Sequence, residues 1–256
     1  MSSSTGLRRF VSGPPPATQA GAAQSSQQPT GTQQPPGTQR SAVESQQGPV
    51  PEKCELCATE IPAEHGHLAD LDHASLQCTC RACYLLFTQR EAVRGRFRAV
   101  PDRYLTDPDH PLTAAEWDEL EIPVGLAFFL RSSRAGTVSG FYPSPAGATE
   151  CRLDLAAWAR LTAAYRLLAT AEPDVEAVLM TRTGADSAGD AIPANAALVQ
   201  ATTIETFVVP IDACYELAGR MRLHWRGFDG GTQARQAIAG FLDTVRRRAV
   251  PVDRET

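Results

Sequence analysis

The chain has 256 residues, 43% of them hydrophobic, and a net charge of −5. This length accommodates one medium-sized domain and a small module, and the apolar content is that of a globular protein. The acidic balance argues against nucleic-acid binding, which usually needs a basic surface. Because every apolar run is shorter than the ~18 residues of a membrane helix, we also expect no membrane contact.

The N-terminal tail, residues 1–51, is predicted to be disordered. Residues 11–50 are rich in Gln, Pro, Gly, Ser and Thr and lack aromatic side chains, so they cannot offset the entropy lost on ordering. The motif LRRF precedes this stretch. It is either an ordinary terminus or a docking peptide that contacts a protein partner through Leu7, Arg8 and Phe10. No apolar export signal follows the arginine pair, so we expect a cytoplasmic protein.

Residues 52–90 are predicted to form a metal-binding module. Two Cys-x-x-Cys pairs, Cys54/Cys57 and Cys80/Cys83, are separated by 22 residues. This spacing is typical of four-thiolate metal sites, in which each pair forms a tight knuckle and a hairpin joins the two knuckles. The second pair enters a helix-compatible run, RACYLLFTQ, as in zinc-ribbon and treble-clef folds. A segment of this size needs the metal in order to fold.

A fifth cysteine, Cys78, has two interpretations. On an extended chain its side chain points to the same face as that of Cys80, so Cys78 either replaces Cys80 as a ligand or lies just outside the metal shell. Three histidines, His65, His67 and His73, are alternative ligands, but their spacing is less regular.

The thiolate ligands favour zinc, with iron as the alternative. Rubredoxin-type iron sites usually carry glycine after the second cysteine of each knuckle, whereas this chain has Ala58 and Tyr84 there. This difference favours a structural zinc ion over an electron-carrying iron. Cys151 and Cys214 have no ligand partner nearby in the sequence and are predicted to be buried thiols.

Residues 91–250 are predicted to form an α+β domain with an inserted loop at 183–203. The order of elements favours a mostly antiparallel sheet with helices packed on one face. The predicted strands cover residues 96–104, 124–131, 137–142, 175–181 and 207–209, and the predicted helices cover 113–120, 153–168, 211–225 and 232–248. The first of these helices opens with a capping box formed by Thr113 and Glu116.

The stretch FYPSPAGATE, residues 141–150, contains two prolines and a glycine. Such a loop is a structural turn, capping the following helix through Thr149 or Glu150, or a partner-binding loop. The binding residues would then be Tyr142, Ser144 and Glu150.

The helix after Pro210 carries a second candidate surface. Arg222 and Trp225 either recognise a protein surface or form an ordinary solvated helix face. An enzyme site near Glu150, Asp212 and His224 is a further alternative, although no Walker A loop, G-x-G-x-x-G or H-E-x-x-H motif occurs.

Eight stretches in this order carry a family resemblance: CELC, CTCRACYLLF, VPDRYL, IPVGLAFFLRSS, FYPSPAGATE, PDVEAVLMTR, VPIDACYELAGRMR and HWRGFDGG. They span residues 52–248 and resemble an actinobacterial family known as domain of unknown function family 5947. The short motif LRRF near the N-terminus also resembles this family. The chain departs from the family at the insert 183–203 and at Cys151, where a small polar residue is expected.

The resemblance implies that the protein is encoded beside NiFe uptake hydrogenases and NifU-like proteins. We therefore expect a non-enzymatic accessory protein with a structural zinc site, which binds a NiFe hydrogenase subunit or its maturation factors. The alternatives are a rubredoxin-like iron–thiolate electron carrier and an enzyme.

Overall fold

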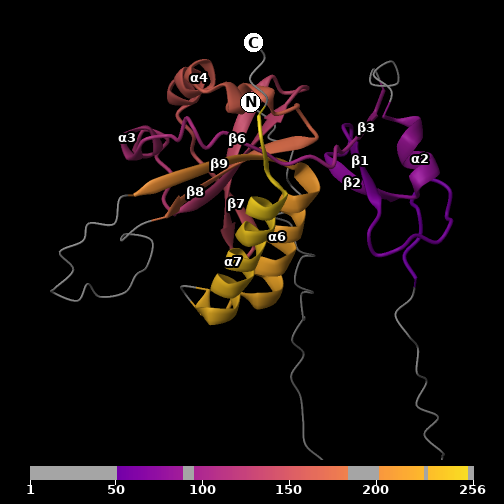
Figure 1. Cartoon of the computed structure of the whole chain (residues 1–256). Helices are drawn as coiled ribbons and strands as arrows, with labels where there is room; N and C mark the ends of the chain where they lie inside the picture. Colours follow the sequence, from indigo (N-terminus) through magenta and orange to yellow (C-terminus); the bar gives the residue numbers. More distant parts are fainter. Residues whose placement is uncertain (1–50, 89–94, 184–201, 228–229, 253–256) are drawn as a thin grey trace, which may run out of the picture.

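The computed structural model describes residues 51–88, 95–183, 202–227 and 230–252. In these ranges the chain forms a small module with a three-stranded sheet beside a larger domain with a seven-stranded sheet (Figure 1). The predicted tail and most of the predicted insert lie outside the described residues. Within the described ranges, no helix combines the length and apolarity needed to cross a membrane.

The module consists of three antiparallel strands and one short helix. Its strand order is β2-β1-β3, with β1 at Gly66–Asp70, β2 at Ser75–Thr79 and β3 at Phe97–Ala99. The hairpin predicted between the two cysteine pairs is formed by β1 and β2. Helix α2, Arg81–Leu86, begins directly after β2.

The larger domain has the strand order β10-β4-β9-β8-β5-β6-β7, and each neighbouring pair is antiparallel except β10 with β4. The predicted α+β class with a mostly antiparallel sheet is therefore confirmed. The elements are β4 Leu105–Thr106, α3 Ala114–Asp118, β5 Leu126–Ser132, β6 Thr137–Ser144, β7 Gly147–Cys151, α4 Leu155–Ala164, α5 Arg166–Thr170, β8 Glu176–Thr183, β9 Thr203–Pro210, α6 Ile211–His224, α7 Gly231–Arg248 and β10 Val250–Pro251.

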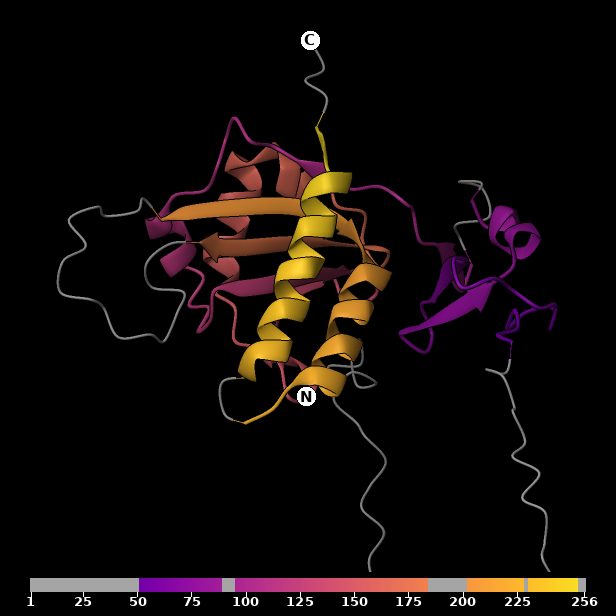
Figure 2. The same ribbon diagram turned by 60° about the horizontal axis from the view of Figure 1, so that its bottom comes forward.

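The helices lie on both faces of this sheet, whereas the sequence led us to expect them on one. Strand β5 sends Phe128 into an apolar cluster with α6 and α7, and sends Phe129 into a second cluster with α3, α4 and α5. Figure 2 shows α6 and α7 in front of the sheet and the shorter helices behind it. The near-continuous apolar runs LAFFL and EAVLM explain this arrangement, because strands covered on both faces have few polar positions.

The helix predicted over 153–168 is divided in two at Tyr165. Its backbone there is extended, with φ −110° and ψ 107°. The Tyr165 hydroxyl donates a hydrogen bond of 2.7 Å to Glu116, which also forms the predicted capping box with Thr113. The break between α4 and α5 is thus fastened to the start of α3.

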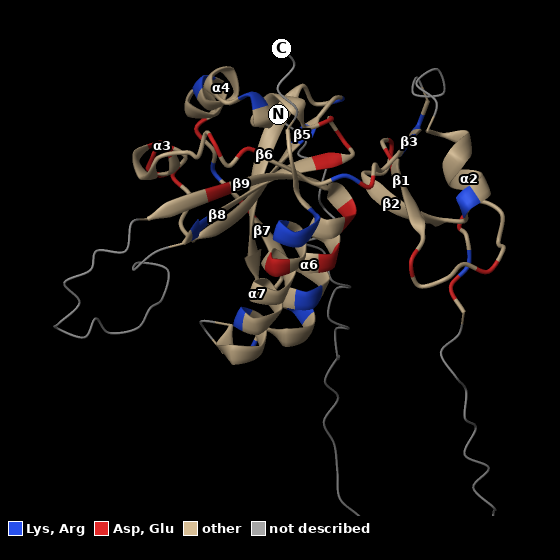
Figure 3. Ribbon diagram, in the orientation of Figure 1, with Lys and Arg blue, Asp and Glu red and all other residues tan. Residues whose placement is uncertain are grey.

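Apolar and polar contacts join the module to the domain. Ala69 and Val100 of the module belong to the same apolar cluster as the helices α6 and α7. Arg98, on β3, donates a 2.7 Å hydrogen bond to the carbonyl oxygen of Pro173 and lies 3.4 Å from the Asp174 carboxylate. Charged residues of both signs occur on both parts (Figure 3). The module is therefore packed onto the domain rather than tethered to it.

The turn between β1 and β2 is organised by one buried carboxylate. The Asp70 side chain, 1% exposed, accepts hydrogen bonds from the Arg96 guanidinium and from the backbone N–H groups of Asp72 and His73. Arg96, opposed by burial, holds the pKa of the Asp70 carboxyl well below its usual range. Because the folded state lowers this pKa, the carboxylate stabilises the fold above about pH 4 and loses this contribution as the pH falls.

We predict that Asp70→Asn lowers the free energy of unfolding by about 2 kcal/mol at pH 7, since it breaks a buried ion pair whose arginine is partly exposed. Urea unfolding measures this loss, and the difference from wild type should narrow below about pH 4. Glu119→Gln is the matched control, because Glu119 pairs with Arg160 at the surface, where a loss under about 0.5 kcal/mol is expected. Equal losses in the two variants would contradict the role given to Asp70.

Candidate metal centre

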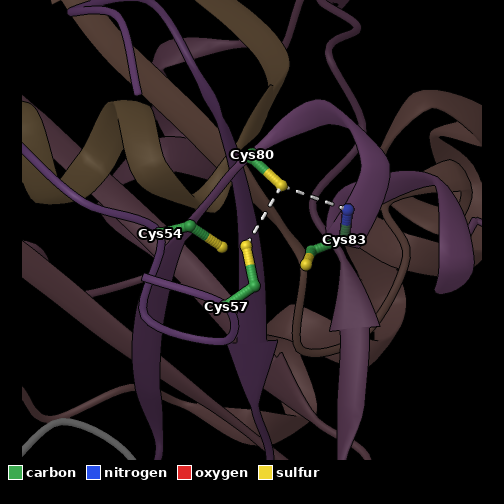
Figure 4. Close-up of side chains that lie close together, drawn as sticks. All are labelled: Cys54, Cys57, Cys80 and Cys83. Atoms are coloured by element: carbon green, nitrogen blue, oxygen red, sulfur yellow. Dashed lines mark hydrogen bonds between the residues drawn. The ribbon is translucent and has the colours of Figure 1, made fainter. Parts of the chain in front are cut away.

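Four cysteines from two distant segments converge at one end of the module. The sulfur atoms of Cys54, Cys57, Cys80 and Cys83 all lie within 4.8 Å of one another. Figure 4 shows them pointing toward a common centre, with 3.7 Å between the sulfurs of Cys57 and Cys80. Tetrahedral zinc with Zn–S bonds of ~2.3 Å places its sulfurs about 3.8 Å apart. The spacing therefore fits a tetrahedral metal ion.

The first knuckle is closed by backbone hydrogen bonds. The Ala58 N–H donates to the carbonyl of Cys54, and the Cys54 N–H donates to that of Thr59, each over 2.8 Å. Ala58 has φ +61°, in the left-handed region that costs a residue with a Cβ roughly 1 kcal/mol. The knuckle thus follows the backbone path that glycine favours, even though the sequence places alanine there.

The second knuckle is the start of helix α2. Cys80 is the N-cap residue, and its sulfur accepts a 3.5 Å hydrogen bond from the backbone N–H of Cys83. The Tyr84 N–H donates to the carbonyl of Cys80 over 2.9 Å. The Cys-x-x-Cys spacing thus places both sulfurs at the first turn of the helix, as the sequence predicted.

Glu55 fastens the two knuckles together. Its backbone N–H donates to the carbonyl of Cys78 over 2.9 Å, and its carboxylate accepts from the Cys78 N–H over 2.7 Å. Because Cys78 lies on β2 and Cys80 follows that strand, this pair of bonds fixes the first knuckle beside the second. The four sulfur atoms are therefore brought together by the hairpin and by Glu55.

The thiols of the cluster differ widely in acidity. Burial opposes ionisation of Cys54, but backbone N–H groups, that of Cys80 foremost, lower its pKa to about 6. The Thr59 hydroxyl lowers the pKa of Cys57. Hydrogen bonding with the Cys80 side chain raises the pKa of Cys83 to about 12. Closely spaced thiolates repel one another, so a divalent cation is what allows all four to ionise together.

We predict that metal binding at this centre strengthens with pH. With a pKa of about 12 in the metal-free protein, Cys83 must lose a proton when a metal binds at neutral pH. The apparent affinity for zinc should therefore rise at least tenfold per pH unit between about pH 6 and 8. It should fall more steeply below about pH 6, where Cys54 also binds a proton. Chelator competition, corrected for the chelator's own protonation, measures the slope, and a flat profile would contradict this account.

The structure places Cys78 outside the four-sulfur cluster and Cys80 inside it. Cys78 instead forms a second group with His65 and His67, whose potential ligand atoms lie within 4.8 Å of one another. The third histidine considered from the sequence, His73, has its ring nitrogen 2.9 Å from the Asp70 carboxylate. The two cysteines predicted to be non-ligand thiols, Cys151 and Cys214, are partly and fully buried.

The stretch FYPSPAGATE forms the β6–β7 hairpin. Ser144 is buried and its hydroxyl accepts a 3.2 Å hydrogen bond from the backbone N–H of Ala146 in the turn. Thr149 and Glu150 lie within β7, so the expectation that one of them caps the following helix is wrong. Asp154 caps α4 instead, accepting from two backbone N–H groups. Continuation of the chain as a second strand delays the helix beyond the proline-rich stretch.

Arg222 of α6 holds this turn in place. It donates a 2.8 Å hydrogen bond to the carbonyl of Ala146. Gly147 has φ +98°, and a Cβ there would lie 2.9 Å from the carbonyl oxygen of Ala218. The close approach of α6 thus requires glycine at this position.

Two further residues were considered as partner-binding from the sequence. Tyr142 is partly buried on β6, and the Trp225 indole N–H donates a hydrogen bond to the carbonyl of Gly227 over 3.0 Å.

The remaining candidate residues are either outside the described residues or too far apart to form one site. Leu7, Arg8 and Phe10 lie outside the described residues. Asp212 is in the first turn of α6 and His224 is its last residue, which separates them by roughly 18 Å at 1.5 Å per residue. The enzyme site considered near Asp212, His224 and Glu150 is therefore not assembled as a single cluster.

Fold and cysteine cluster together define an α+β protein with a four-cysteine module suited to a metal ion. The model of DUF5947, described as a family of unknown function, matches residues 53–249. The chain belongs to this family, and the family resemblance predicted from the sequence is confirmed. No curated protein and no solved structure matches the chain.

Proposed function

We propose that this chain is a non-enzymatic accessory protein whose four-thiolate centre holds a structural zinc ion. The observation that carries the proposal is the convergence of four sulfurs, from two separate knuckles, at distances suited to tetrahedral coordination. Four protein ligands leave no position for a substrate, and such closed sites usually stabilise a fold. Here the ion would fix the first knuckle against the hairpin and the start of α2.

Iron is the alternative metal, because four thiolates also suit a rubredoxin-like centre. Two observations favour it, and the first is that the Ala58 backbone adopts the left-handed conformation typical of a glycine in such a knuckle. Cys57 is also exposed, as an electron-transfer centre requires. The two metals are distinguished optically, because iron–thiolate centres absorb visible light and zinc does not.

We predict that Cys83→Ser removes one equivalent of zinc relative to the wild-type protein, because three thiolates bind the ion far more weakly than four. Elemental analysis of the full chain, purified without chelators, measures the stoichiometry. Cys151→Ser is the matched control, since Cys151 lies outside the cluster, and it should leave the zinc content unchanged. A coloured protein containing iron in place of zinc, or a Cys83→Ser variant with undiminished metal, would contradict the proposal.

The accessory role also requires a surface for a protein partner. Three leucines on the metal-binding segments have exposed side chains: Leu56 in the first knuckle, and Leu85 and Leu86 in α2. Apolar side chains that are exposed as a group, rather than singly, mark sites of protein contact. The proposed partner is a NiFe hydrogenase subunit or one of its maturation factors, the class implied by the family resemblance, and the tail motif LRRF would assist docking.

We predict that Leu86→Asp weakens capture of this partner at least tenfold, because it places a charge within an apolar contact. Leu223→Asp is the control: both leucines are 68% exposed, but Leu223 lies on α6 of the larger domain. Pull-down of purified hydrogenase subunits and maturation factors by the full chain, by each variant and by a chain without residues 1–12 measures the effect. Equal capture by the two leucine variants would exclude this docking surface, and no capture by the full chain would exclude the partner class.

A further inference from the structure

The group formed by His65, His67 and Cys78 lies beside the four-thiolate centre. One potential ligand atom from each residue lies within 4.8 Å of the others. The register of the hairpin produces the group, because His67 of β1 pairs directly with Cys78 of β2. The rings of His65 and His67 are 4.8 Å apart between centroids.

Hydrogen bonds define which nitrogen of each histidine is available. The Nδ1 atom of His65 lies 2.9 Å from the carbonyl oxygen of Pro62. A carbonyl oxygen can only accept a hydrogen bond, so Nδ1 carries the proton and Nε2 of the neutral ring has a free lone pair. The His65 side chain is 8% exposed, and among the described residues its Nε2 has no hydrogen-bond partner. Burying such an atom without a partner is costly.

His67 is oriented in the same way by the larger domain. Its Nδ1 donates a 2.9 Å hydrogen bond to the carboxylate of Asp212, in the first turn of α6. Metal-bound histidines characteristically donate their second N–H to a carboxylate or a backbone carbonyl, which fixes the ring and makes it a better ligand. Both arrangements occur here: His67 donates to the carboxylate of Asp212, and His65 donates to the backbone carbonyl of Pro62.

We infer that His65, His67 and Cys78 form a second metal site, which binds a late first-row transition-metal ion such as zinc. Two imidazoles and one thiolate suit zinc, copper or nickel and disfavour magnesium and calcium. Tetrahedral coordination needs ligand atoms about 3.3–3.6 Å apart, so side-chain adjustments of about 1 Å complete the site. Three protein ligands leave one position open to water or to an exchangeable ligand.

The two sites are neighbours with different roles. Cys78 and Cys80 are two residues apart, roughly 7 Å along an extended chain. The four-thiolate centre is closed, whereas the His65–His67–Cys78 site has an open position and is connected through Asp212 to α6. A metal there would be held by three side chains of the module. One of them, His67, is hydrogen-bonded to Asp212 of the larger domain. Asp212 is thus a positioning residue for the metal rather than a ligand.

Metal stoichiometry of the full chain, saturated with zinc and desalted, tests this inference. We expect two equivalents in the wild type and one in each of His65→Gln and Cys78→Ser. Two matched controls, His110→Gln and Cys151→Ser, should keep both equivalents, because neither residue belongs to a cluster of potential ligands among the described residues. Cobalt substitution should show that His65→Gln and Cys78→Ser retain the sulfur-to-metal absorption of the four-thiolate centre, which establishes that the module is folded.

Asp212→Asn provides an independent readout, because the ligands themselves are unchanged. Loss of a carboxylate behind a metal-bound histidine typically weakens metal binding 10–100-fold, so one of the two zinc affinities should fall by this factor. A single equivalent in the wild type that only Cys83→Ser removes would overturn this inference and leave the proposed structural zinc intact. Two equivalents retained in both His65→Gln and Cys78→Ser would overturn it as well.

Discussion

The convergence of sulfur atoms that repel one another when ionised is the constraint on which the module depends. Two turns of the backbone, one closed by the N–H of Ala58 and the other by the first turn of α2, direct four thiols to one point. Without a cation these thiols cannot all lose their protons, since each thiolate disfavours the next. A tetrahedral ion bound there would remove this repulsion and would supply folding energy to a segment that has little apolar surface of its own.

The surroundings of the cluster extend this organisation toward the larger domain. Glu55 bonds both backbone groups of Cys78 and thereby sets the first knuckle against β2. At the opposite end of the same hairpin, the Asp70 carboxylate pairs with Arg96 and accepts a hydrogen bond from the backbone of the turn. His67 lies opposite Cys78 in the hairpin and bonds to Asp212. The hairpin therefore joins the surroundings of the cysteine cluster to α6.

Much of this arrangement could be predicted because it depends on local sequence. The Cys-x-x-Cys spacing indicated the knuckles, and the Thr113 capping box and the long helices α6 and α7 followed from local patterns. The hairpin was also predicted, but its register, which places His67 opposite Cys78, was not. The irregular spacing of the histidines along the chain gave no indication of the His65–His67–Cys78 group, because ligands on facing strands need no regular spacing.

Features that depend on distant residues could not be predicted in this way. The partners of Tyr165 and of Arg222 are Glu116 and the carbonyl of Ala146, which are far away in the chain. The break between α4 and α5 and the tight β6–β7 turn depend on them. Helices were expected on one sheet face, although the uninterrupted apolar runs of β5 and β8 are typical of strands covered on both faces. Only the structure shows which helices lie on each face.

The shared apolar cluster has a consequence for cooperativity. Ala69 and Val100 belong to the module, yet they lie in the same core as Phe241 and Val245 of α7. Parts of a chain that share one core generally melt together in a single transition. A change in stability at the cysteine cluster is consequently expected to change the stability of α7, which lies about 160 residues further along the chain than Cys80.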